Sequence, residues 1–192
     1  MAGLLDKVVK QKRGPWNHGW YASVVVEDML KRDTSIQATS DYESSKGDSR
    51  NLCLIISSIN QGMTQTHEFR INYRPEALFD EARRNEVIAD REKNMRDHIS
   101  LERLKDVEEA FGTITPNGNG GIDAHRMIGR ECRAYLGVFQ KDPSGGKNPL
   151  PVKKAEFDKL TEEERGGMFN MVTQVGPAKE QVGPAKVEVA KK

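Results

Sequence analysis

The stretch RECRAYLGVFQK, residues 130–141, combines cations and aromatic rings in an alternating pattern. If it forms a β-strand, successive side chains point to opposite faces of the sheet. One set is small and apolar and suits a core: Cys132, Ala134, Leu136 and Val138. The other set carries two cations, two rings and a glycine: Arg133, Tyr135, Gly137, Phe139 and Lys141. A solvent-facing set is usually plainly polar, so this composition indicates a binding surface.

Aromatic rings and cations on one strand suit single-stranded nucleic acid. Unpaired bases stack on rings whatever their sequence, and cations attract the phosphates. A glycine at position 137 would let a base or ribose approach the backbone closely. The alternative is that Tyr135 and Phe139 pack under helices, and that Arg133 and Lys141 are ordinary solvated charges.

Further candidates come from the preceding strands and loops. In QTHEFRINY, residues 65–73, one face is read as core and Arg70 on the other face as a phosphate contact. Lys46 and Arg50 lie in a long polar stretch after the first strand, where they either contact a ligand or belong to a solvated loop. These candidates would extend the basic surface.

The two tryptophans receive different interpretations. Trp20 alternates with Ala22, Val24 and Val26, which favours a core position. Trp16 lies outside that pattern and follows Lys12 and Arg13, so an exposed stacking ring beside a basic arm is one interpretation. The other is that Trp16 covers the end of the sheet.

The elements that would position these residues follow from pattern. We expect strands at 19–30, 51–60, 65–73, 130–141 and 150–157, the second and third forming a hairpin. Helices are expected over about 75–112, with Pro75 in a first turn, Ser100 as an N-cap and Gly112 as a stop. IDAHRMIG, residues 122–129, predicts a single helical turn.

This order of elements predicts a mainly β fold with a helical insert. Five strands with helices between the third and the fourth are the arrangement of an OB-fold, a small Greek-key barrel that holds oligonucleotides or oligosaccharides. The predicted organisation is a basic arm over 1–18, an OB-fold domain over 19–160 and a flexible, mildly basic tail over 161–192. The tail contains VGPAK twice.

The chain resembles the single-stranded-DNA-binding proteins of phage replication and recombination modules, an OB-fold family. The resemblance rests on GWYASVVVED, NLCLIISSINQG, THEFRINY, LERLKDVEEAFG, IDAHRMIGRECRAYLGV and GGKNPLPVKKAEF, in this order. It implies single-stranded DNA as partner, with recombinase or replication proteins as further partners. The charged insert itself is expected to cover one end of the barrel or to contact another protein, including a second copy of the chain. The long charged insert and the basic tail depart from the family's pattern.

Composition narrows the function classes. A net charge of +1 means that any polyanion site must be local, and residues 76–109 carry eleven acids against seven bases, a net charge of −4. Four scattered histidines and two cysteines, Cys53 and Cys132, lack metal-ligand spacing, so we expect buried thiols and no metal or other cofactor. No phosphate loop or nucleophile motif is present, which argues against an enzyme.

The sequence therefore predicts a cytoplasmic protein that coats single-stranded DNA with little sequence preference, without contact with a membrane. Arg133, Tyr135, Phe139, Lys141, Arg70, Trp16, Arg13, Lys46 and Arg50 are its predicted binding residues. The alternative function is a protein-interaction module of the same fold, acting through the charged helical insert.

Overall fold

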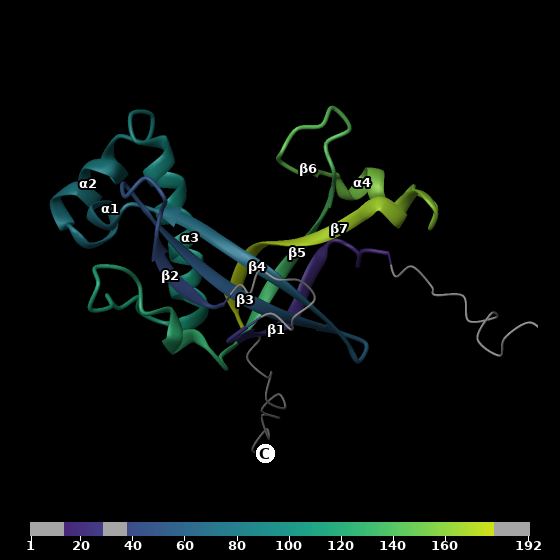
Figure 1. Cartoon of the computed structure of the whole chain (residues 1–192), viewed down its shortest axis with the longest axis horizontal. Helices are drawn as coiled ribbons and strands as arrows, with labels where there is room; N and C mark the ends of the chain where they lie inside the picture. Colours follow the sequence, from purple (N-terminus) through teal and green to yellow (C-terminus); the bar gives the residue numbers. More distant parts are fainter. Residues whose placement is uncertain (1–13, 29–37, 179–192) are drawn as a thin grey trace, which may run out of the picture. The chain divides into compact units, whose positions relative to one another are not determined.

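The computed structural model describes residues 14–28 and 38–178. The chain is mainly β, with a seven-stranded sheet and several short helices within these ranges (Figure 1). It divides into two compact units. The larger contains Trp20–Tyr135 and Val172–Lys192, and the smaller contains Met1–Gly19 and Leu136–Met171. The sequence predicted one domain over 19–160, whereas two long strands, β5 (Glu131–Gln140) and β7 (Met168–Pro177), contribute to both units.

Strand β3 organises the larger unit. β3 (Arg50–Asn60) pairs antiparallel with β4 (Met63–Tyr73) along its whole length, and with β1 (Gly19–Val26) and β2 (Ser40–Glu43). β5 lies next to β1, and β7 next to β5. β3 has paired neighbours on both edges, and its continuous apolar run from Leu52 to Ile56 is fully buried, so side chains on both faces of the strand are covered there.

The β3–β4 hairpin forms as the sequence predicts. Its two-residue turn consists of Gln61 and Gly62, with φ values of 49° and 78°. Two successive left-handed residues are the conformation that matches the right-handed twist of the flanking strands. Glycine at 62 therefore fixes the register in which Ile59 faces Thr64.

Strand β2 and the turn after it occupy residues 40–49, in the second half of the long loop expected before β3. Tyr42 pairs with Asn51 across the β2–β3 ladder. The connection is closed by a hydrogen bond from the Ser44 N–H to the Ser49 carbonyl of 2.8 Å. Lys46 is exposed within this turn.

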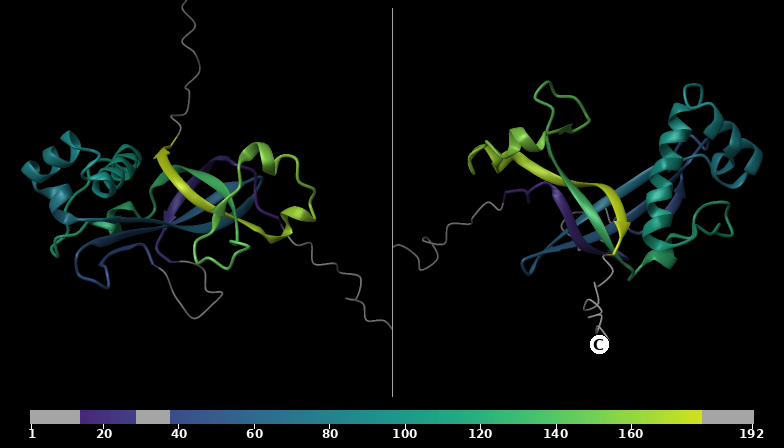
Figure 2. Two further views of the ribbon diagram at one scale, coloured as in Figure 1. Left: turned by 90° about the horizontal axis from the view of Figure 1, so that it is seen from above. Right: turned by 180° about the vertical axis from the view of Figure 1, so that it is seen from behind.

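The helical insert lies between β4 and β5, as predicted, and comprises α1 (Pro75–Phe79), α2 (Glu81–Ala89) and α3 (Met95–Phe111) (Figure 2). Pro75 occupies the first turn of α1, and Gly112 ends α3 with φ of 88°. The predicted N-cap Ser100 is instead inside α3. Its hydroxyl donates to the carbonyl oxygen of Asn72 at 2.7 Å and so ties α3 to β4.

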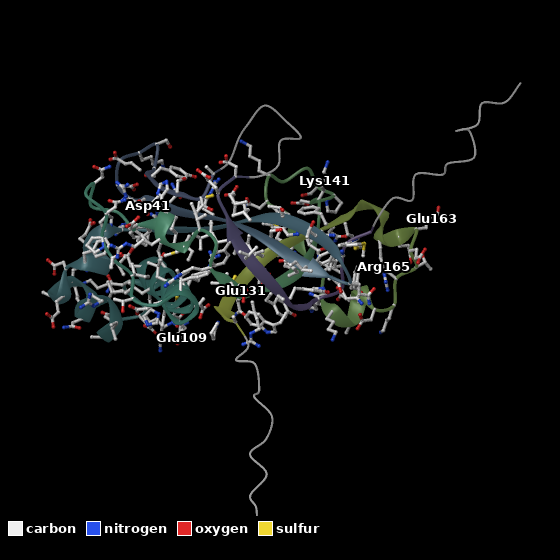
Figure 3. The ribbon with its side chains drawn as sticks, turned by 90° about the horizontal axis from the view of Figure 1, so that it is seen from below. Asp41, Glu109, Glu131, Lys141, Glu163 and Arg165 are labelled. Atoms are coloured by element: carbon white, nitrogen blue, oxygen red, sulfur yellow. The ribbon has the colours of Figure 1, made fainter. Side chains whose placement is uncertain are left out.

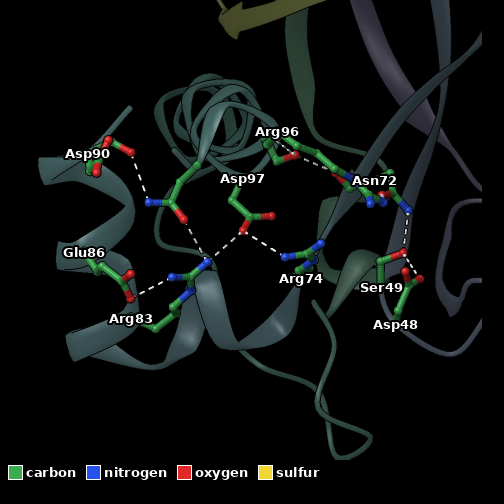
Figure 4. A network of polar contacts seen from close by, with 11 residues as sticks. Asp48, Ser49, Asn72, Arg74, Arg83, Glu86, Asp90, Arg96 and Asp97 are labelled. Atoms are coloured by element: carbon green, nitrogen blue, oxygen red, sulfur yellow. Dashed lines mark hydrogen bonds and ion pairs between the residues drawn. The ribbon is translucent and has the colours of Figure 1, made fainter. Parts of the chain in front are cut away.

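A polar network holds the insert together (Figure 4). The buried carboxylate of Asp97 lies 3.4 Å from Arg74 and 3.3 Å from Arg83. Arg83 also donates to Asn94 at 2.9 Å. Two cations satisfy one buried carboxylate here, so these arginines serve the architecture of the helices.

The smaller unit corrects the prediction for the end of the domain. LPVKKAEF forms only the two-residue β6 (Leu150–Pro151), because the following lysine–alanine–glutamate run favours helix and forms α4 (Lys154–Phe157). After the 3₁₀ turn η2 (Glu164–Gly167), residues placed in the tail form the long strand β7. The core of this unit comprises Val138, Val152 and Phe157.

Candidate nucleic-acid interface

The sheet of the larger unit has two unlike faces, and the ladder registers assign each residue to one of them. The core face contains Tyr21, Ser23 and Val25 of β1 opposite Ser58 and Ile56 of β3. The open face contains the alternate residues, with Ala22 opposite Ile59 and Val24 opposite Ser57. Helix α3 packs against β4, and Arg103 of α3 lies 4.9 Å from the ring centroid of Phe69 on the core face.

The open face carries a cluster of one cation and two rings from β1 and β5. Trp20 is 45% exposed, and its ring meets that of Tyr135 edge-to-face with centroids 5.5 Å apart. The guanidinium of Arg133 lies 5.3 Å from the Trp20 centroid and donates from Nε to the carbonyl oxygen of Pro177 at 2.9 Å. A hydrogen-bonded cation over an exposed indole is a geometry that can accept a stacked base and its phosphate.

The strand β7 lies close to this cluster. Gly176 of β7 lies next to the indole of Trp20: a Cβ at 176 would be 3.5 Å from Trp20 Cζ3, an ordinary van der Waals contact. The Thr173 hydroxyl donates to the carbonyl oxygen of Tyr135. The cluster is therefore held by contacts with β7 as well as by its own strands, β1 and β5.

A second cation–ring pair occupies the same face on β2 and β4. The guanidinium of Arg70 lies 5.9 Å from the centroid of Tyr42, whose side chain is exposed. Arg70 is also paired with Glu68 at 2.5 Å. Since Tyr42 is opposite Asn51 and Arg70 opposite Cys53, both residues share the open face with Trp20.

Arg50 has a structural role in the described structure. Its Nε lies 2.5 Å from Asp41 Oδ1, whose side chain is fully buried, and Asp41 also accepts from the Tyr73 hydroxyl at 2.7 Å. A Cβ at Gly121 would overlap the Asp41 and Arg50 side chains. This buried network accounts for the glycine at 121 and engages Arg50 away from the open face.

Trp16 is buried, at 9% exposure, which contradicts its interpretation as an exposed stacking ring. In the smaller unit its backbone N–H donates to Asn170 Oδ1 at 2.7 Å, and its carbonyl accepts from Asn170 Nδ2 at 3.0 Å. Asn170 Nδ2 also donates to the carbonyl oxygen of Gly137, and Gly137 is buried as well. The interpretation of Trp16 as a cover therefore fits better.

The remaining predicted residues do not join the open-face cluster. Phe139 is half-buried on β5 and Lys141 is exposed just after that strand, both in the smaller unit (Figure 3). Arg13 lies outside the described residues. Of the predicted set, the structure of the larger unit thus brings Arg133, Tyr135 and Arg70 onto one face.

Sequence reasoning missed Trp20 and Tyr42. The apolar alternation of Trp20, Ala22, Val24 and Val26 resembled a core pattern, while two core positions on β1 and β3 are serines. Ser23 and Ser58 satisfy one another at 2.8 Å in the core. Because this serine pair is buried, the polar side chain of β1 faces the core and the apolar alternation faces the other side. The sequence of β1 alone does not reveal this.

Metal-ligating side chains do not cluster among residues 14–28 and 38–178. This part of the chain holds no group of three or more His, Cys, Asp or Glu side chains placed to bind a metal. Both thiols are buried, which raises the pKa of Cys53 to about 11 and that of Cys132 to about 12. Nor does any described helix have the length and apolar character needed to cross a membrane.

Comparison with known proteins adds no relative: no family model, curated protein or solved structure matches this chain.

Proposed function

We propose that the chain binds single-stranded DNA across the open face of the larger unit, with little sequence preference. The observation that carries this proposal is the cluster of an exposed Trp20 with half-buried Tyr135 and Arg133, on a sheet face where solvation alone requires no rings. Base–ring stacking contributes about 1–3 kcal/mol per base and tolerates any base. Binding, without a chemical step, would keep the strand unpaired and protected.

Tyr42 and Arg70 extend the proposed interface to the far side of β3. Between the two cation–ring pairs this face presents Ala22, Ser57 and Ile59, together with Cys53 and Ile55, whose side chains are buried. The strands lie in the order β4, β3, β1 and β5, with the short β2 beside β3 on the edge that β1 also occupies. A nucleic-acid strand laid across them would meet rings at both ends and a cation beside each. The protein would then contact the phosphates through its cations and stack its rings on the bases, without hydrogen bonds to base edges.

Strand order supports an OB-fold for the proposed binder. Leaving aside the short β2, three successive strands β1, β3 and β4 are neighbours, and β5 returns through the helical insert to lie beside β1. The spatial order β5–β1–β3–β4 is that of a Greek key, with β7 added next to β5. The oligonucleotide-binding surface of OB-folds is a strand face of this kind.

A direct binding measurement tests the proposal. Fluorescence anisotropy of a labelled oligothymidylate of about 30 nucleotides is compared with that of the matching duplex, at low and moderate salt. Tight binding of the single strand, weaker binding of the duplex and a loss of affinity with salt are expected. Absence of single-strand binding even at low salt would contradict the proposal.

A further inference from the structure

The guanidinium of Arg70 already has an anionic partner on the open face. Its Nε lies 2.5 Å from Glu68 Oε1, and the side chains of Arg70 and Glu68 are 45% and 22% exposed. The two residues are two positions apart on β4, so their side chains point to the same side of the sheet. The carboxylate of Glu68 therefore lies where a phosphate of a bound strand would approach Arg70.

This ion pair lies beside an exposed ring and a buried thiol. The Arg70 guanidinium is 5.9 Å from the centroid of Tyr42, and Arg70 is opposite Cys53 in the β3–β4 ladder. Burial raises the pKa of the Tyr42 hydroxyl and that of the Cys53 thiol, while Arg70 lowers both pKa values and Glu68 raises them. Because Arg70 and Glu68 act on the same two neighbours with opposite sign, the cation and the carboxylate belong to one small region of the face.

The position of the carboxylate limits how a phosphate can reach Arg70. A guanidinium binds phosphate best with two parallel N–H groups. Since Glu68 engages Nε, an incoming phosphate must either displace the carboxylate or bind beside it, where the two anions repel each other. Both routes weaken the contact between the phosphate and Arg70.

The second cation of the open face has a partner of a different kind. Arg133 Nε donates to the carbonyl oxygen of Pro177 at 2.9 Å. A carbonyl oxygen fixes the guanidinium in place without carrying a charge that would cancel it. The two ends of the open face therefore differ: the cation beside Trp20 is held by a neutral group, and the cation beside Tyr42 by an acid.

We propose that Glu68 limits the affinity of the open face for single-stranded DNA by competing with phosphate for Arg70. This inference rests on the proposed function. The carboxylate pairs with Arg70 while the face is empty and pairs again when the strand leaves. Contact at the Tyr42 end is thereby exchanged more readily than contact at the Trp20 end, and neutralising Glu68 strengthens binding.

Anisotropy titrations of labelled oligothymidylate with the native chain and Glu68→Gln test the proposal. Glutamine keeps the size of the side chain and removes its charge, so binding should become about fivefold tighter, at the upper end of what an exposed ion pair contributes. Glu109→Gln is the matched control. It makes the same change in net charge at another exposed pair, 4.0 Å from Lys105 in the helical insert, and should leave the affinity unchanged.

A double-mutant cycle separates competition at Arg70 from a general effect of charge. In the Arg70→Gln background the phosphate contact is absent, so adding Glu68→Gln should change the affinity by less than about twofold. A gain that persists at full size without Arg70 would mean that Glu68 repels the strand from a distance, and would overturn the proposed competition.

The outcomes distinguish this inference from the proposed function. If the native chain and Glu68→Gln both fail to bind the single strand, the proposed function is wrong and the inference falls with it. If the native chain binds but Glu68→Gln binds no more tightly than Glu109→Gln, the proposed function stands and the competition is wrong. Binding that becomes measurable only in Glu68→Gln would support both.

Discussion

The guanidinium of Arg133 lies 5.3 Å from the centroid of the Trp20 ring, while its Nε is held by the carbonyl oxygen of Pro177. Strands β1, β5 and β7 are all needed for this relationship, so it exists only in the folded larger unit. A ring presented in this way is a spectroscopic probe as well as a proposed stacking surface.

Tryptophan fluorescence should report binding through Trp20 alone. Single-stranded oligothymidylate is expected to quench the emission of the native chain, because a base stacked on the exposed indole replaces water. Trp20→Phe should abolish the quenching, whereas Trp16→Phe should retain it, since Trp16 is buried. Quenching that survives in Trp20→Phe and disappears in Trp16→Phe would exclude Trp20 as the stacking ring.

The salt dependence of binding should identify the phosphate contacts. Each contact with a single strand contributes about −0.7 to the slope of log K against log salt. Arg70→Gln and Arg133→Gln should each flatten the slope by about that amount. Arg126→Gln, which removes a cation of η1 (Ala124–Met127) with a side chain 69% exposed, should leave the slope unchanged. Equal effects of all three substitutions would mean that general charge, and no defined contact, controls affinity.

The buried network around Asp41 should control stability. Asp41→Ala leaves Arg50 and the Tyr73 hydroxyl without their shared acceptor, and should lower the free energy of unfolding by about 3 kcal/mol in a urea titration. Glu68→Ala, at the more exposed pair with Arg70, should cost less than about 1 kcal/mol.

The same network explains why Gly121→Ala should be destabilising. Its Cβ would overlap Asp41 and Arg50, whereas Gly118→Ala meets no atom within 4 Å. Equal midpoints for the two alanine variants would argue that the loop simply moves aside.

The stability of the native chain should fall in mild acid through His67. Burial lowers the pKa of this imidazole below its ordinary value of 6.5, so the unfolded state binds its proton more readily. The stabilisation is complete above pH 6.5 and is lost as the pH falls from 6.5 toward the folded-state pKa. His67→Gln should flatten the dependence in this window, while His125→Gln, at an exposed position, should not. Unfolding midpoints measured between pH 7.5 and 5 check this.

Local signals made part of the fold predictable. The β3–β4 hairpin follows from strong alternation and from the glycine at 62, and the helical insert from Pro75 and a run of helix formers. The last strand was not predictable in the same way. Residues 168–177 mix Asn170 and Gln174 with apolar residues, and Asn170 is buried only because Trp16, 154 positions earlier, bonds both its amide atoms.

The candidate site was predictable only on a strand whose own sequence alternates core residues with outward-facing ones. On β5, buried Cys132 and Ala134 alternate with Arg133 and Tyr135, so the open face was identified correctly there. On β1 the roles of Trp20 and Trp16 were reversed, since Ser23 becomes a core residue through its bond to Ser58 on another strand. Partners distant in the sequence decide such positions.

The most direct test of the account is the affinity of the Trp20→Ala and Tyr135→Ala variants for oligothymidylate, measured by anisotropy beside the native chain. Loss of a stacked base costs about 1–3 kcal/mol, so each variant should bind about 5- to 150-fold more weakly. Phe79→Ala, which removes an exposed ring of the helical insert, should bind as the native chain does. Unchanged affinity in both Trp20→Ala and Tyr135→Ala would contradict the assignment of the open face as the DNA-binding surface.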